Sequence, residues 1–178
     1  MLAFLKKNYL YFLLAFIALF PYIFSLNNEF LSDDIPGIVQ NPDIGTARYF
    51  TRIPPLFTQP VLYNITYKMF GLTPWAFRLP NLLSHIGVVL VIFAVVKKIT
   101  GSEKTGVLSA LITAVHPLQS EAVLWISGGI HCWLAFFCTT GLSSVLAKKV
   151  GLGGRKHLSF DAYHLRKGYG LFPNSFAL

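Results

Sequence analysis

Apolar residues gather in four runs along this chain, at about residues 9–26, 79–96, 105–116 and 130–147. A helix that crosses the ~30 Å hydrocarbon core of a membrane needs about 20 mainly apolar residues. Three of the runs approach that length. The third has only about a dozen residues before Pro117, a length that also fits a re-entrant or buried segment. The pattern predicts an all-α membrane protein with about four transmembrane helices.

Lysines at the ends of these runs predict the orientation of the helices, because basic residues favour the cytoplasmic side. Four crossings place every bordering lysine on one side: Lys6, Lys7, Lys97, Lys98, Lys104, Lys148 and Lys149. Three crossings would leave the last pair outside. We therefore expect a multi-pass protein of a bacterial plasma membrane or the endoplasmic reticulum, with a cytoplasmic N-terminus. Residues 27–78 would form a long outer loop and residues 116–129 a short outer connection.

Composition supports a membrane location and argues against nucleic-acid binding. Hydrophobic residues make up 54% of the chain and charged residues 12%, against roughly 25% charged in soluble domains. The net charge is +8, but the basic residues lie at the ends of apolar runs, where they orient helices. Cys132 and Cys138 lie inside an apolar run and are interpreted as small buried hydrophobic residues.

The first apolar run is interpreted as a retained membrane anchor. It is longer than the apolar core of a typical signal peptide. The residues that follow it, Phe24 to Asn27, also lack a small-x-small cleavage site.

Two segments of the outer loops are expected to form helices on the membrane surface. The first lies at 62–70, between Pro60 and Pro74. The second lies at 118–126, where apolar residues recur at helical spacing and Glu121 falls on the opposite side. Glu121 is therefore expected to face water or a cavity.

The candidate functional residues are polar and are expected at the outer membrane face. Ionisable groups next to or inside spanning segments are functional candidates by default. Five ionisable residues, Asp33, Asp34, His85, His116 and Glu121, and the polar Asn81 are expected near this face. Structural alternatives remain open. The Asp33–Asp34 pair can begin a turn before Pro36, His85 can pair with a neighbouring helix, and His116 can cap the third run.

A series of short motifs resembles the amino-terminal part of GT-C-type integral membrane glycosyltransferases. In order, they are FLSDD at 30–34, NP at 41–42, QPVL at 59–62, FGL at 70–72, FRLPNLLSH at 77–85, HP at 116–117 and EAVLWISG at 121–128. Within that superfamily, the chain is most similar to the branch of protein O-mannosyltransferases and of transmembrane proteins with tetratricopeptide repeats. The resemblance covers about residues 4–146 and rests on the order and spacing of the motifs.

This resemblance implies transfer of a sugar from a polyprenyl-phosphate donor to an acceptor on the outer face, with inversion. Asp33 would act as the base on the acceptor, as a carboxylate within hydrogen-bond reach of a hydroxyl can. Asp34 would orient Asp33 or help to hold a divalent cation, the one cofactor considered. The expected partners are membrane lipid, the polyprenyl-phosphate-linked sugar donor and an acceptor that the sequence does not identify. No nucleic acid is expected as a partner.

The donor phosphate requires cationic or hydrogen-bonding groups at the membrane surface. Arg78 is the first candidate, Arg48 and Arg52 are further outer arginines, and the other substrate-binding candidates are Asn81, His85, His116 and Glu121. The chain departs from the family pattern at two positions. Arg78 stands where the family more often has histidine, and Gln59 stands where arginine is more usual.

The end of the chain departs from the family most. Residues 1–148 are expected to form a partial GT-C-like transmembrane domain, whereas 149–178 have neither helical nor strand periodicity and would form an irregular cytoplasmic tail. Because family members continue for several more spans, a truncated or frameshifted end is favoured over a small four-span protein. The alternative function is that of a non-catalytic subunit, scaffold or pseudo-enzyme fragment, so the sequence leaves open whether the chain is an enzyme. Part of a transporter is less favoured, because no span carries a charge at its centre.

Overall fold

The computed structural model describes residues 2–49 and 58–152 and their side chains over 8–49 and 59–146. The described elements are helical, and no strand occurs among them. They are α1 (Leu2–Leu19), the 3₁₀-helix η1 (Ile23–Ser25), the π-helix η2 (Ile35–Val39), α3 (Thr58–Phe70), α4 (Pro74–Thr100), α5 (Glu103–Val115), α6 (Gln119–Leu124) and α7 (Gly129–Leu152). The expected all-α class is confirmed.

The chain divides into a unit at residues 1–140 and a second unit at 141–178. The first unit contains the helices up to the start of α7. The described part of the second unit is the rest of α7, which continues as a helix through Leu152. The irregular tail is expected to begin at residue 149. Its residues from 153 onward lie outside the part of the chain that the structure describes.

Within the described residues, three helical stretches are long and apolar enough to cross a membrane: Asn8–Ser25, Pro74–Thr100 and Gly129–Leu146. The chain is therefore a multi-pass membrane protein. The expected third crossing corresponds to α5, which has only 13 residues. The number of crossings and the side on which the N-terminus lies stay predictions.

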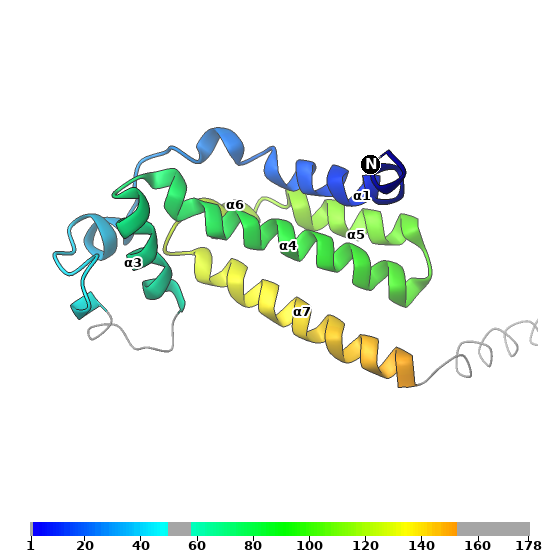
Figure 1. Cartoon of the computed structure of the whole chain (residues 1–178). Helices are drawn as coiled ribbons and strands as arrows, with labels where there is room; N and C mark the ends of the chain where they lie inside the picture. The colour runs from blue at the N-terminus through cyan, green and yellow to red at the C-terminus, as the bar shows by residue number, and fades with distance from the viewer. Residues whose placement is uncertain (1, 50–57, 153–178) are drawn as a thin grey trace, which may run out of the picture. The chain divides into compact units, whose positions relative to one another are not determined.

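One of three hydrophobic clusters in the described part of the first unit forms where α1, α4 and α5 lie side by side (Figure 1). Its buried residues come from all three helices: Leu14, Ala18, Val89, Phe93, Ala110 and Ala114. Small residues recur on α5 at Gly106, Ala110 and Ala114, each buried, which lets membrane helices approach closely. A Cβ on Gly106 would lie 3.0 Å from the Phe93 carbonyl oxygen of α4. The small residues of α5 thus allow α4 and α5 to pack closely.

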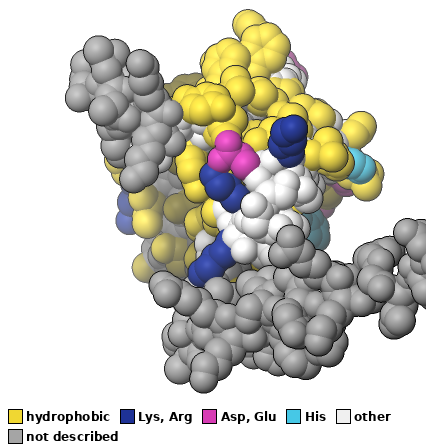
Figure 2. Space-filling view, turned by 90° about the vertical axis from the view of Figure 1, so that its right-hand side faces the viewer, with side chains coloured by type: hydrophobic (Ala, Val, Ile, Leu, Met, Phe, Trp, Pro, Cys, Tyr) yellow, Lys and Arg dark blue, Asp and Glu magenta, His cyan; other side chains and the backbone are white. Residues whose placement is uncertain are grey.

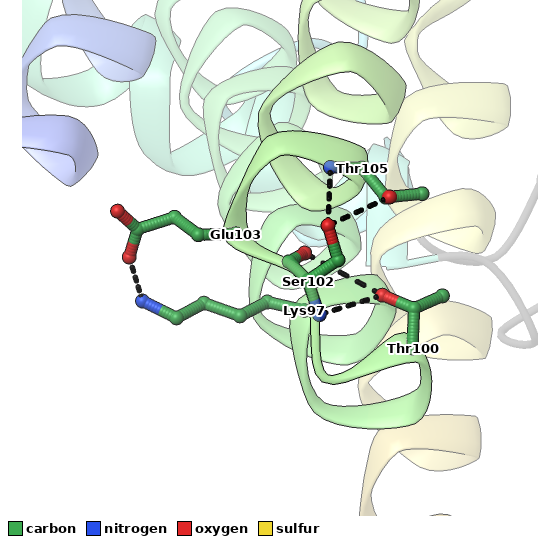
Figure 3. A network of polar contacts seen from close by, with 5 residues as sticks. All are labelled: Lys97, Thr100, Ser102, Glu103 and Thr105. Atoms are coloured by element: carbon green, nitrogen blue, oxygen red, sulfur yellow. Dashed lines mark hydrogen bonds and ion pairs between the residues drawn. The ribbon is translucent and has the colours of Figure 1, made fainter.

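A tight turn joins α4 to α5 (Figure 3). Gly101 ends α4 with a φ of 67°, in the left-handed region that glycine adopts without strain. Ser102 then caps α5, and its Oγ accepts a hydrogen bond of 3.3 Å from the Thr105 N–H. Across the turn, Lys97 forms an ion pair with Glu103. We call this end of the first unit the lysine end.

The two short helices α5 and α6 together follow α4 along much of its length. The carbonyl oxygen of Ala114, near the end of α5, lies 3.4 Å from His85 Nε2. His85 is about 16 Å along α4 from its first residue, at 1.5 Å per residue. α6 then returns the chain to the start of α4, where Arg78 contacts Leu124. The end at which α4 and α7 begin is called the loop end.

Some helix boundaries differ from those expected from the sequence. α1 ends at Leu19 and gives way to turns and η1, although apolar residues continue to 26. α4 begins at Pro74, which occupies its first turn, so Pro80 lies inside the helix rather than near its start. The two surface helices are present, with α3 longer than expected and α6 shorter.

Candidate functional site

The segment Leu124–Ser127, which runs from the last residue of α6 towards α7, is the centre of the polar structure at the loop end. Its backbone leaves the helix at Trp125, which has a ψ of 116°. Unpaired carbonyl groups at membrane depth are costly and must be satisfied by protein groups. Side chains from α3 and α4 donate to the carbonyl oxygens of all four residues. We call this arrangement the carbonyl knot.

Arg78 forms the largest part of the knot. It is only 1% exposed. Its Nε donates to the Leu124 carbonyl oxygen at 2.7 Å. The two terminal nitrogens donate to three carbonyls of the chain that leaves the first apolar run: Leu26 at 3.0 Å, Asn28, and Glu29 at 2.7 Å. The guanidinium thus ties the chain that follows the first apolar run to the end of α6, and it is buried rather than directed at the surface of the protein.

Three uncharged side chains complete the knot. Tyr63 Oη donates to the Ile126 carbonyl oxygen at 2.7 Å. Gln59 Nε2 donates to the carbonyl oxygens of Ile126 at 3.2 Å and Ser127 at 3.0 Å. Asn81 Nδ2 lies 3.4 Å from the carbonyl oxygens of both Trp125 and Ile126. The amides therefore supply donors where the backbone has no helical partner.

Asp34 accepts hydrogen bonds from the same segment. It is fully buried. Its Oδ1 accepts from the Ser127 N–H at 2.8 Å and from the Ser127 Oγ at 2.6 Å, and its Oδ2 accepts from the Leu31 N–H at 3.4 Å. Burial and the negative charge of Asp34 raise the pKa of the Tyr63 phenol well above its ordinary value. That phenol therefore stays protonated and continues to donate to Ile126.

Asp33 and Asp34 have different surroundings, because the backbone makes a sharp turn immediately before them. Ser32 has a φ of 47°, a left-handed conformation uncommon for a residue with a side chain. The Asp34 N–H closes the turn on the Leu31 carbonyl oxygen at 2.9 Å. Asp33 is exposed, and its Oδ1 accepts from the Ser32 Oγ at 3.4 Å. One carboxylate is thus anchored inside the protein while the other faces out.

A cleft of about 430 Å³ opens beside this turn. We call it the rim cleft, and its lining consists of Leu31, Ser32, Ser120, Glu121, Leu124 and Trp125. Glu121 is exposed, as expected, and also lines a smaller cleft of about 290 Å³ that includes His131. The acidic turn after the first apolar run and the acidic residue of α6 thus border the same cleft.

Four of the expected site residues contact the segment from Leu124 to Ser127 or line the cleft beside it: Asp34, Arg78, Asn81 and Glu121. Asp33 lies next to Ser32 of the same cleft. The two histidines lie elsewhere. His85 is buried and packs edge-on against the Tyr22 ring at 5.5 Å. His116 is exposed between α5 and α6, and its Nδ1 accepts from the Leu118 N–H at 3.3 Å.

A divalent cation does not suit the surroundings of Asp34. Among the described residues, no group of three or more His, Cys, Asp or Glu side chains could hold a metal ion. Both oxygens of Asp34 already accept from hydrogen-bond donors, which take the space that a cation would need. No step in the mechanism below uses a cation.

Three residues of the knot were missed as site residues by the sequence reasoning: Gln59, Tyr63 and Ser127. Gln59 drew attention only as a departure from a family pattern, and Ser127 only as part of a motif. For Gln59 and Tyr63 the sequence did contain a signal, because these two polar residues of α3 are four residues apart on one helical face. Arg52, an expected phosphate candidate, lies outside the described residues, and no structural role is assigned to it.

Comparisons with known proteins find distant relatives. Over 123 residues, 58% of this chain, it is 28% identical to "Protein O-mannosyl-transferase TMTC1" of Homo sapiens. Over 87 residues, 49% of this chain, it is 31% identical to "Protein O-mannosyl-transferase TMTC3" of Homo sapiens. These matches cover 14% and 9% of the two relatives, so the chain spans a small part of their length. No model of a protein family matches, and no solved structure matches. The chain is thus a multi-pass membrane protein with distant similarity to two protein O-mannosyl-transferases.

Proposed function

We propose that the chain serves in an integral membrane glycosyltransferase that moves a sugar from a polyprenyl-phosphate donor to an acceptor hydroxyl at the rim cleft, with inversion. Two independent lines support this proposal. The relatives are named protein O-mannosyl-transferases, and the loop end presents an exposed carboxylate beside a cleft. The single observation that carries the proposal is the contrast between two adjacent aspartates: Asp34 is buried and accepts hydrogen bonds from Ser127, whereas Asp33 is exposed.

Asp33 is proposed as the general base. Its carboxylate takes the proton of the acceptor hydroxyl while the hydroxyl oxygen attacks the anomeric carbon of the donor sugar. The bond between that carbon and the phosphate oxygen breaks, and the phosphate leaves with the electron pair. Attack from the face opposite the leaving group inverts the anomeric configuration. The acceptor proton ends on Asp33, from which solvent removes it.

Asp34 is proposed as a positioning residue. Its two contacts to Ser127 hold the acidic turn against the segment that precedes α7, so the outward direction of Asp33 is set by a buried neighbour rather than by solvent. A base held within hydrogen-bond reach of its target gains rate because it needs little reorganisation. Asp34 therefore orients the base without touching the reacting atoms.

Arg78 is proposed as a structural residue of the knot and not as the ligand of the donor phosphate. A guanidinium has five N–H donors, and carbonyl oxygens accept from all three of its nitrogens. Asn81 and His85 are proposed to have a structural role as well, since both are buried and directed at backbone carbonyls. His116 does not line the rim cleft, but it is exposed in the turn that leads into α6, whose Ser120 does line it, and it is the proposed contact for the phosphate.

The test uses the full chain in liposomes with a polyprenyl-phosphate sugar carrying a radiolabel and a hydroxyl-bearing acceptor peptide. Removing a general base costs roughly 10²–10⁴ in rate, so Asp33→Asn should lower transfer by at least about a hundredfold. Glu29→Gln is the matched control, because Glu29 is an exposed carboxylate of the same loop with no part in the mechanism. Equal turnover in Asp33→Asn and wild type would remove Asp33 as the base. A wild type that transfers no sugar would favour the non-catalytic alternative.

A further inference from the structure

A second cleft lies away from the rim cleft, between α1 and α5 at the lysine end. Its volume is about 360 Å³, and its lining consists of Tyr9, Leu10, Glu103, Lys104, Val107, Leu108 and Leu111. All these residues belong to the first unit. We call it the lysine-end cleft. It has no part in the sugar transfer proposed above.

The lining of this cleft changes from charged to apolar along α5. Glu103 and Lys104 lie in the first turn of the helix, whereas Val107, Leu108 and Leu111 line the next two turns. From Glu103 to Leu111 the helix rises about 12 Å, at 1.5 Å per residue. A membrane lipid has the same order of chemistry, with a polar headgroup followed by a hydrocarbon chain.

The charge at the mouth of the cleft is positive. Glu103 forms an ion pair with Lys97 of α4, which offsets its negative charge (Figure 3). Lys104 is exposed and has no acidic partner in the part of the chain that the structure describes. Figure 2, the view from the lysine end, shows basic side chains near an acidic one with hydrophobic atoms around them. The mouth therefore favours an anionic group.

We propose that the lysine-end cleft binds one anionic glycerophospholipid. The phosphate-bearing headgroup pairs with the Lys104 ammonium, and one acyl chain lies between Leu10 of α1 and the apolar turns of α5. Tyr9 borders the headgroup region, where aromatic residues of membrane proteins commonly lie. Such a lipid would fill the space between α1 and α5 at the end where the two helices leave a cleft.

The test is native mass spectrometry of the full chain, released from detergent after addition of phosphatidylglycerol or phosphatidylcholine with identical acyl chains. Wild type should retain more phosphatidylglycerol than phosphatidylcholine. Lys104→Gln should lower retention of phosphatidylglycerol about fivefold, the size expected for one basic residue at an anionic membrane surface, and leave phosphatidylcholine unchanged. Leu108→Trp should fill the cleft and lower retention of both lipids.

Lys98→Gln is the matched control, because Lys98 is an exposed lysine at the end of α4 that does not line the cleft. It should retain both lipids as wild type does. Equal losses in Lys98→Gln and Lys104→Gln would overturn the site in favour of general surface charge, and so would equal binding of the two lipids by wild type. If Lys104→Gln lowers the thermal midpoint, Lys104→Arg should restore retention by keeping the charge. The readout does not depend on sugar transfer.

Discussion

Ser127 holds Asp34 through two groups at once, its N–H at 2.8 Å and its Oγ at 2.6 Å, across 93 residues of sequence. The contact joins the acidic turn that follows the first apolar run to a residue two positions before the start of α7. Because Asp34 is fully buried, the bond to its charge is worth more than a bond at the surface. Hydrogen bonds to charged groups contribute roughly 1.5–3 kcal/mol.

Ser127→Ala removes the hydroxyl donor and keeps the N–H. We expect the free energy of unfolding to fall by about 1.5–3 kcal/mol, measured by circular dichroism during thermal unfolding in detergent. Ser109→Ala is the control, because its Oγ donates only to the Thr105 carbonyl oxygen one turn earlier. Equal stability of Ser127→Ala and Ser109→Ala would show that the hydroxyl of Ser127 does not hold Asp34.

Arg78→Lys keeps the charge but loses the planar arrangement of donors. A lysine ammonium is a compact point charge and cannot reach carbonyls that the guanidinium spans from Leu124 to Glu29. Each buried carbonyl left without a donor costs roughly 1–3 kcal/mol, so Arg78→Lys should lower the yield of folded protein in membranes and its thermal midpoint. Lys68→Ala, an exposed cation of α3, should change neither. A folded Arg78→Lys variant that only binds donor more weakly would restore Arg78 as a phosphate ligand.

Gly129→Ala places a methyl group against Asn81, since a Cβ at Gly129 would lie 2.0 Å from Asn81 Oδ1. Overpacking of this kind costs roughly 1–3 kcal/mol, and we expect a loss of stability in that range by thermal unfolding. Gly141→Ala is the matched control in the same helix, because a Cβ there would meet nothing within 4 Å. It should be neutral or stabilising by up to about 1 kcal/mol. In Gly129→Ala/Asn81→Ala, the combined loss should be smaller than the sum of the single losses.

High pH should destabilise the segment between α1 and α4 through its buried tyrosines. Burial raises the pKa of Tyr49 to about 12, whereas an unfolded tyrosine titrates near 10. The folded state thus holds its proton more tightly, so this contribution to stability is fully present below pH 10 and is lost as pH rises towards 12. Tyr49→Phe should make stability fall less steeply over that window, followed by circular dichroism. Tyrosinate absorbance in wild type that rises fully by pH 10.5 would contradict the raised pKa.

The polar pattern of the sequence was enough to place several elements. α5 lies close to the predicted third run, because Ser102 caps its start and the His116–Pro117 pair follows its end. Asn81 and His85 are four residues apart, on one face of α4, and both are buried there. Local signals of this kind act within a few residues, so they can be seen without the tertiary structure.

The candidate site was predicted only in part. The sequence predicted that Asp33, Asp34 and Glu121 lie near one membrane face, which stays a prediction, and the rim cleft is lined by residues of the acidic turn and by Glu121. It could not show that Asp34 points inward and Asp33 outward. That difference depends on the positive φ of Ser32 and on Ser127, a partner far along the chain.

By itself, the sequence determined that this chain is a helical membrane protein with an acidic turn after its first apolar run, because hydrophobic run length and cap residues act locally. Only the tertiary structure decided what Arg78 does. An arginine near the membrane surface can face water, a phosphate or the backbone. Here the carbonyls of Leu26 and Leu124, 52 and 46 residues away, come within hydrogen-bond distance of the guanidinium. Backbone that leaves the helical path near a membrane must find donors, and folding brings Arg78 to it.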